Sequence, residues 1–151
     1  MKEKIYVPAG EGKSYDVIGG DHVVIKATGE QTGGMATILE TTVPAGGGPP
    51  RHLHERESET FYVLEGEFEF EIDGDKYNLK QGDFFAAPAN VPHQFRNTAT
   101  SPSKLLVVCQ PAGFENFIEA FAQIPLDAAP DPAKMAELGA QFGVQFLPPS
   151  E

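Results

Sequence analysis

Apolar and polar positions alternate in short runs through the middle of the chain. Residues 68–72 show the clearest case, with Phe68, Phe70 and Ile72 on one face and Glu67, Glu69 and Glu71 on the other. A period of two predicts a strand with one buried and one wet face. The pair Asp73-Gly74 follows at once and is a strong signal for a two-residue hairpin.

Similar runs recur at even spacing, separated by turns rich in Gly, Pro, Asn and Asp. We expect further strands within residues 23–25, 35–43, 60–64, 76–79, 83–87, 93–97 and 104–110. The stretch at residues 44–50, Pro-Ala-Gly-Gly-Gly-Pro-Pro, can continue neither a helix nor a strand ladder. Many short strands of this kind predict an all-β sandwich or barrel.

The pattern changes near the C-terminus. Phe114, Phe117, Ile118 and Phe121 recur at helical spacing, which predicts one apolar helix face. A second, weaker helix is predicted from Pro132 to about residue 139 or 142, with Asp131 as its N-cap. These helices can pack against the barrel, form a lid over a pocket mouth, or do both. We therefore expect one domain over residues 1–151, with a barrel core at about 20–110 and a C-terminal helical segment at about 113–143.

Charge and composition narrow the function classes. The 151 residues carry 22 acidic and 11 basic side chains, for a formal charge of −11, and no basic run offsets it. Such a surface repels phosphate backbones and anionic membranes, so no nucleic acid or membrane partner is expected. The N-terminus does not have the pattern of a signal peptide, which predicts a cytoplasmic protein. Cys109 is the only cysteine, and its apolar neighbours predict an inert buried thiol.

Three of the four histidines fall in two clusters that carry the candidate chemistry. In the first, His52 and His54 are two residues apart and therefore share one face of a strand. Glu59 lies at an odd offset and joins that face only if the polar residues 55–58 bend or bulge. His93 comes from a strand distant in sequence, which a closed barrel can bring to the same interior point. Three imidazoles and a carboxylate suit a divalent transition metal such as Mn, Fe, Co, Ni, Cu or Zn.

The positions of Gly, Pro and Asn around these residues resemble the two signature motifs of the cupin superfamily. The first motif runs from Gly46 through the His-x-His pair to Gly66, and the second from Gly82 through Pro88 to Asn97. The second departs once, because Asn90 stands where the family usually has Gly, and Asn also tolerates a left-handed turn. The resemblance implies a double-stranded β-helix, the cupin jelly-roll barrel, with short C-terminal helices. It also implies that His52, His54, Glu59 and His93 are the metal ligands.

The expected surroundings of this site are apolar. By alternation Phe61 and Val63 share the face of Glu59, and Phe95 shares that of His93, with Phe68 and Phe70 as further pocket candidates. An aromatic pocket suits a planar or aromatic ligand. Alternatively, any of these side chains simply fills the barrel core. Four protein ligands would leave one or two positions open on a five- or six-coordinate metal, as catalytic sites do.

Residues 54–66 and the phrase Pro-Ala-Gly-Phe-Glu at residues 111–115 are similar to small bacterial quercetin 2,3-dioxygenase-like cupins. That resemblance implies a dioxygenase that cleaves a small hydroxylated aromatic or enolic compound of the flavonol-like class, with dioxygen as co-substrate and Glu59 as ligand and base. Two alternatives stay open. One is a metal-dependent isomerase or lyase acting on a small polar substrate, and the other is a non-catalytic small-molecule-binding cupin. A homodimer joined through sheet edges is also expected.

Overall fold

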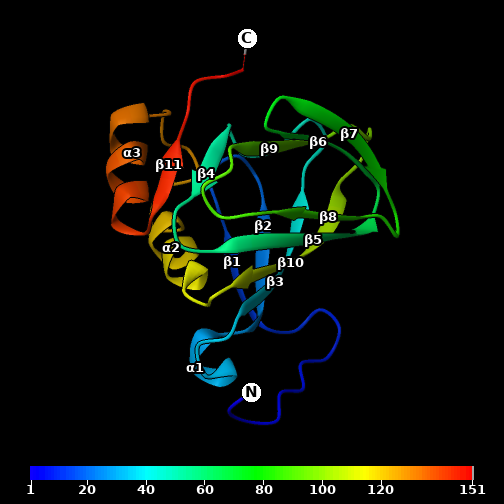
Figure 1. The fold of residues 1–151 in the computed structure, drawn as a ribbon, viewed down its shortest axis with the longest axis vertical. Coiled ribbons are helices and arrows are strands. Elements are labelled where there is room, and N and C mark those ends of the chain that lie inside the picture. Colours follow the sequence, from blue (N-terminus) through cyan, green and yellow to red (C-terminus); the bar gives the residue numbers. More distant parts are fainter. Residues whose placement is uncertain (151) are drawn as a thin grey trace.

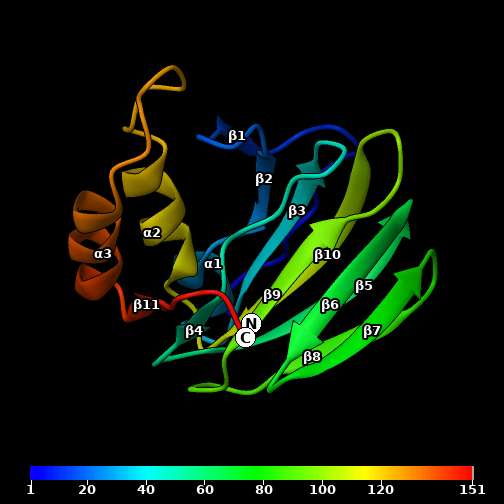
Figure 2. The ribbon, with the colours of Figure 1, turned by 90° about the horizontal axis from the view of Figure 1, so that it is seen from above.

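Two antiparallel β-sheets face each other and enclose the core (Figures 1 and 2). The computed structural model describes residues 1–150. The six-stranded sheet has the order β1-β2-β3-β10-β5-β8, and the five-stranded sheet the order β11-β4-β9-β6-β7. The strands of the six-stranded sheet are β1 (Lys13–Asp16), β2 (His22–Ala27), β3 (Thr37–Val43), β10 (Ser103–Gln110), β5 (Ser58–Glu65) and β8 (Phe84–Ala87). The second sheet holds β11 (Val144–Phe146), β4 (His52–His54), β9 (His93–Asn97), β6 (Glu67–Ile72) and β7 (Asp75–Lys80).

Three helices lie outside the sheets: α1 (Gly29–Thr32), α2 (Phe114–Phe121) and α3 (Pro132–Gln141). Figure 2 shows α2 and α3 together on one side of the barrel, next to β4 and β11. As predicted, Asp131 caps α3, with its carboxylate accepting a hydrogen bond from the Lys134 backbone at 3.2 Å. No helix within residues 1–150 is long and apolar enough to cross a membrane.

The expected jelly-roll fold is confirmed, and the predicted hairpin is present. Asp73 and Gly74 both have positive φ, 49° and 89°, which the two-residue turn between β6 and β7 requires. Strands β1 and β11 and the short helix α1 were not predicted. The first two are short, and α1 is a single turn held by a capping box between Thr28 and Gln31.

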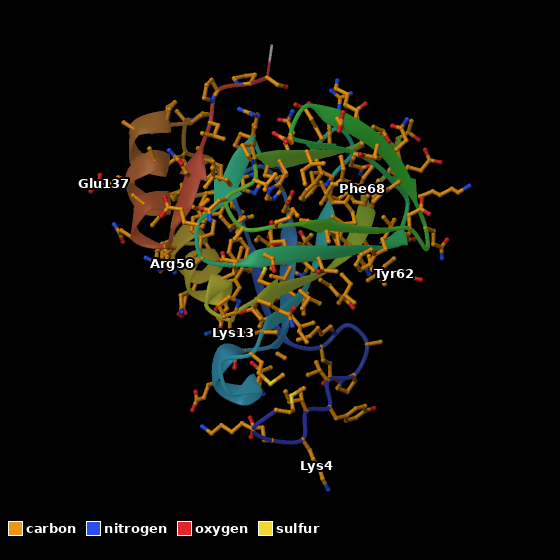
Figure 3. The ribbon with its side chains drawn as sticks, in the orientation of Figure 1. Lys4, Lys13, Arg56, Tyr62, Phe68 and Glu137 are labelled. Carbon is orange, nitrogen blue, oxygen red and sulfur yellow. The ribbon has the colours of Figure 1, made fainter. Side chains whose placement is uncertain are left out.

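Aromatic and branched side chains fill the space between the sheets. Phe61, Phe68 and Phe70 are at most 1% exposed, and the Phe70 ring lies edge to face with each of the other two. Figure 3 shows Phe68 between the sheets, whereas Lys4 and Glu137 project from the outer surface. Burying one such side chain contributes on the order of 2–3 kcal/mol, so this cluster is a main source of stability.

The polar face of β6 differs from its prediction at one position. Glu67 is exposed and Glu69 partly so, but Glu71 is only 6% exposed. Its carboxylate accepts hydrogen bonds from Ser150 and, at 2.9 Å, from Gln94, and the bond from Ser150 is the main cause of a lowered pKa. A segment about 80 residues away in sequence therefore covers it, which strand periodicity alone does not reveal.

Candidate metal centre

Strand β4 delivers two imidazoles to the barrel interior. His52 and His54 are 6% and 2% exposed, while Leu53 between them faces outward. β4 pairs with β9 in a register that sets His52 opposite His93, which is 2% exposed. The alternation of a strand and the pairing of two strands distant in sequence thus bring three imidazoles together.

Glu59 reaches the same point from the other sheet, as the sequence required, through a break in the strand. Residues 55–57 leave the ladder between β4 and β5. Glu59 then lies on the inner face of β5 at 5% exposure. The break also turns Glu57 inward, where its carboxylate accepts a hydrogen bond from Nδ1 of His54 at 2.8 Å. Glu57 was predicted only as part of a polar bend, so its place beside the site was missed.

The four side chains fit one metal ion. One ligand atom from each, taken from His52, His54, Glu59 and His93, lies within 4.8 Å of all the others. An ion with bonds of about 2.1 Å holds opposite ligand atoms about 4.2 Å apart, so the set needs to close by only about half an ångström. Nε2 of His54 is 3.0 Å from Oε2 of Glu59 without forming a hydrogen bond, and within residues 1–150 this buried nitrogen has no hydrogen-bond partner. A buried nitrogen with no protein partner, next to the other donor atoms, fits the role of a metal ligand.

Each imidazole is held by an acceptor on its far side. Such an acceptor fixes the tautomer and the ring orientation and leaves Nε2 to face the centre. The three Nδ1 contacts are His52 with the Pro50 carbonyl at 2.8 Å, His54 with Glu57 at 2.8 Å and His93 with the Val91 carbonyl at 2.9 Å.

Burial and the neighbouring charges separate the pKa values of these groups. Burial, aided by the nearby His93, lowers the pKa of His52 to about 3, so this imidazole is neutral and ready to act as a ligand. Burial also acts to lower the pKa of His54, but the carboxylates of Glu59 and Glu57 outweigh it and raise that pKa to about 9. Burial likewise opposes ionisation of Glu59, yet the charge of the adjacent His54 and the hydrogen bond from His93 hold the pKa of Glu59 well below the usual range.

Cys109 lies directly behind the carboxylate. Its thiol is fully buried, and its sulfur is 3.7 Å from Oε1 of Glu59. Burial raises the pKa of Cys109 well above its ordinary value. The thiol is therefore neutral and shielded, which agrees with the inert cysteine predicted from the sequence.

The cluster opens into a cavity of about 510 Å³ between the barrel and the C-terminal helices. His52, His54 and Glu59 lie in its wall. The rest of the lining is mostly apolar and includes the α2 side chains Phe114, Phe117, Ile118 and Phe121. The helix therefore both packs on the barrel and covers the cavity.

The predicted pocket residues separate into two groups. Phe61 and Phe95 line the cavity. Val63, Phe68 and Phe70 are fully buried in the core and are not among its lining residues within the described chain. Alternation assigns a side chain to a face but does not say how far along the barrel the cavity extends. The lining from α2 was foreseen only as a possible lid.

The fold and the cluster define an antiparallel jelly-roll protein with a buried three-histidine, one-glutamate site able to hold a metal. A family model described as "Cupin domain" matches residues 39–109, which include all four candidate ligands. Residues 39–109, just under half of the chain, therefore form a cupin domain.

Comparison with curated proteins finds quercetin 2,3-dioxygenase of Bacillus subtilis, 34% identical over 97 residues that cover 63% of this chain and 28% of that protein. An uncharacterized protein of Methanocaldococcus jannaschii is 32% identical over 75 residues, which cover 50% of this chain and 60% of its own length. The chain thus spans less than two thirds of either relative.

Solved structures show the same fold. A predicted oxalate decarboxylase from Thermotoga maritima superposes with a TM-score of 0.67 at 23% identity, covering 71% of this chain and 99% of that one. KdgF from Halomonas sp. superposes with a TM-score of 0.68 at 24% identity, covering 76% and 99%.

Proposed function

We propose that this protein is a metal-dependent dioxygenase that cleaves a small hydroxylated aromatic or enolic compound. The observation that carries the proposal is the junction of the candidate metal site with a largely apolar cavity of about 510 Å³. That volume is typical of small-molecule sites. The partial similarity to quercetin 2,3-dioxygenase supports an oxygen-dependent reaction.

A metal on His52, His54, Glu59 and His93 would supply Lewis-acid and redox chemistry at the inner end of the cavity. The chain's own groups supply the rest. Glu59 carries the only carboxylate of this set, and we assign it as the base that accepts the proton of a substrate hydroxyl. The aromatic wall excludes water and positions a planar ring, with Phe61 and Phe95 among its members.

The test combines metal analysis with oxygen consumption. The parent, supplied with single transition metals in turn, is mixed with quercetin in an oxygen electrode, and products are identified by mass spectrometry. We expect one equivalent of metal and oxygen uptake matched to ring-cleaved product. His54→Ala loses the metal, and Glu59→Gln loses turnover. His22→Ala is the matched control, because His22 is exposed and pairs with Asp16 outside the site.

The outcomes separate the alternatives. Conversion of a small polar substrate without oxygen uptake would establish an isomerase or lyase instead. Ligand binding with no conversion by any metal-loaded form would establish a binding protein. The apolar cavity wall favours the dioxygenase over a sugar-type reaction, for which polar and charged lining groups are needed.

We also propose that the protein forms a homodimer in the cytoplasm through a sheet edge. Strand β1 is an edge strand of the six-stranded sheet and is largely exposed, which supports this. Light scattering coupled to gel filtration measures the mass directly, and a monomer at micromolar concentration would contradict the dimer.

A further inference from the structure

Four polar side chains line the cavity away from the metal cluster: Asp131 and Lys134 belong to the C-terminal helical segment, and Asp21 and Thr41 to the barrel. Thr41 on β3 is 5% exposed and faces inward between Leu39 and Val43. Asp21 immediately precedes β2, after the turn at Gly19. Both line the same cavity as the candidate metal ligands.

The Thr41 hydroxyl has no partner. Within residues 1–150 its buried Oγ1 makes no hydrogen bond. A buried hydroxyl without a partner is costly, and native proteins keep such groups where something else satisfies them. Thr42 is the next residue and its side chain lies on the opposite, more exposed face of the strand. The unpartnered hydroxyl of Thr41 therefore lies on the side of β3 that faces the cavity.

Asp21 is the second member of the pair. His22 pairs with Thr42 in the β2–β3 register, so Asp21 and Thr41 fall diagonally across neighbouring strands on one face. Within the described chain the Asp21 carboxylate forms no ion pair or hydrogen bond, and only the backbone carbonyl of Asp21 accepts one, from the Val17 N–H at 3.0 Å. Burial raises the pKa of this carboxyl to about 6.

The sheet register sets the distance from this pair to the metal site. Thr41 pairs with Leu105, and Leu105 pairs with Val63, four residues beyond Glu59 on β5. Four residues along a strand and two strand spacings across correspond to about 16 Å measured along the sheet. A ligand that reaches both ends must therefore be elongated, with an apolar middle matched to the wall between them.

We propose that Asp21 and Thr41 form a hydrogen-bonding site for the far end of the ligand, which carries a hydroxyl group opposite its metal-binding end. This rests on the proposed function for the position of the metal-binding end. The Asp21 carboxylate accepts a hydrogen bond from the ligand hydroxyl, and the Thr41 hydroxyl donates one to the same oxygen. The pair would then select hydroxylated ring compounds over purely apolar ones of the same shape.

The test uses two probes that differ by one hydroxyl, 2-naphthol and naphthalene, and measures their dissociation constants with zinc-loaded protein by fluorescence. We expect the parent to prefer 2-naphthol by about tenfold, the effect of one hydrogen bond to a charged group. Asp21→Asn and Thr41→Val are expected to lose most of this preference and to bind naphthalene as the parent does. Thr42→Val is the matched control and should keep the preference for 2-naphthol.

Thermal unfolding without probe gives a second readout. Thr41→Val replaces an unpartnered hydroxyl by a methyl group of similar size, so its midpoint should equal or exceed that of the parent. A lowered midpoint would mean that the hydroxyl serves the fold, and would overturn the proposal. Equal binding of the two probes by the parent, no binding of either, or an undiminished preference in both variants would also overturn it.

The two proposals fail separately. Oxygen uptake with 3-hydroxyflavone, which keeps the chelating group but has no hydroxyl on its far ring, reports on the dioxygenase alone. Absence of uptake together with a naphthol preference that depends on Asp21 and Thr41 would reject the dioxygenase and keep the polar site. Oxygen uptake without a preference for 2-naphthol would reject the polar site and keep the dioxygenase.

Discussion

Asp21→Asn is expected to stabilise the protein at neutral and alkaline pH and to leave it unchanged in acid. Burial raises the pKa of Asp21 from 3.8 to about 6 in the folded chain. The folded state therefore holds this proton more tightly than the unfolded state does. The penalty for the buried charge is absent below about pH 4, grows between pH 4 and 6, and is complete above pH 6.

The size of the effect follows from that difference. One pKa unit corresponds to about 1.36 kcal/mol, so a rise from 3.8 to about 6 sets an upper bound of about 3 kcal/mol. Asp21 keeps some exposure to solvent, and the asparagine amide must itself be buried, so we expect a gain of about 1–2 kcal/mol at pH 8. For a domain of this length, that gain corresponds to a rise in the unfolding midpoint of roughly 2–8 °C.

Urea unfolding of the parent and of Asp21→Asn at pH 4, 6 and 8 measures this directly. Asp131 and Lys134 also line the cavity and are the same in both proteins, so the comparison isolates the change at Asp21. Asp75→Asn, at an exposed carboxylate on β7, is the control and should show no pH-dependent gain. A gain of equal size at all three pH values, or a loss at pH 8, would refute the assignment of a buried, unpaired carboxylate.

Three further changes test other parts of the structure. Glu57→Gln weakens the acceptor that holds His54 and should lower metal affinity about 10- to 100-fold in a chelator competition, with little change in the unfolding midpoint of the metal-free protein. Phe117→Ala removes a 6%-exposed side chain that both packs in the core and lines the cavity, and should cost about 3–4 kcal/mol in urea unfolding. Gly48→Ala places a Cβ against a backbone oxygen of β9 at a φ of +146°, so this variant should not fold stably. Gly46→Ala, at a φ of +74° with open space around it, should lower the free energy of unfolding by only about 1–2 kcal/mol. Thermal denaturation compares the two variants.

The metal end of the site could be predicted because its geometry follows from strand alternation and turn residues. His52 and His54 share a face through their spacing alone. Asn90 takes the left-handed conformation expected of it, with a φ of 66°, and its backbone N–H donates to the His54 carbonyl at 2.7 Å. Glu59 needed a break after β4, and the structure has that break at residues 55–57.

Contacts between segments far apart in sequence were beyond such reasoning. β11 pairs with β4, about 90 residues earlier, and so places Val144 and Phe146 in the cavity wall. Phe117 was predicted as the buried face of a helix, but periodicity does not say which surface that helix covers. The inward turn of Glu57 depends on how residues 55–57 leave the sheet, and a run of polar residues gives no direction for that turn.

The candidate metal ligands at one end of the cavity follow a family motif, whereas Asp21 and Thr41 at the other end lie outside it. This difference helps to define the ligand. The candidate metal ligands come from β4, β5 and β9 with spacings that a family pattern describes. Asp21 lies outside residues 39–109, the range that the family model matches, and Thr41 lies inside that range but off the ligand motifs. Enzymes that carry out a common reaction on different substrates need the same ligands at the metal, because the metal acts on the reacting group. They need different residues at the far wall, because that wall selects the rest of the molecule. The proposed substrate should therefore be sought among compounds that form hydrogen bonds with Asp21 and Thr41, and the relatives named above guide the search only at the end that meets the candidate metal site.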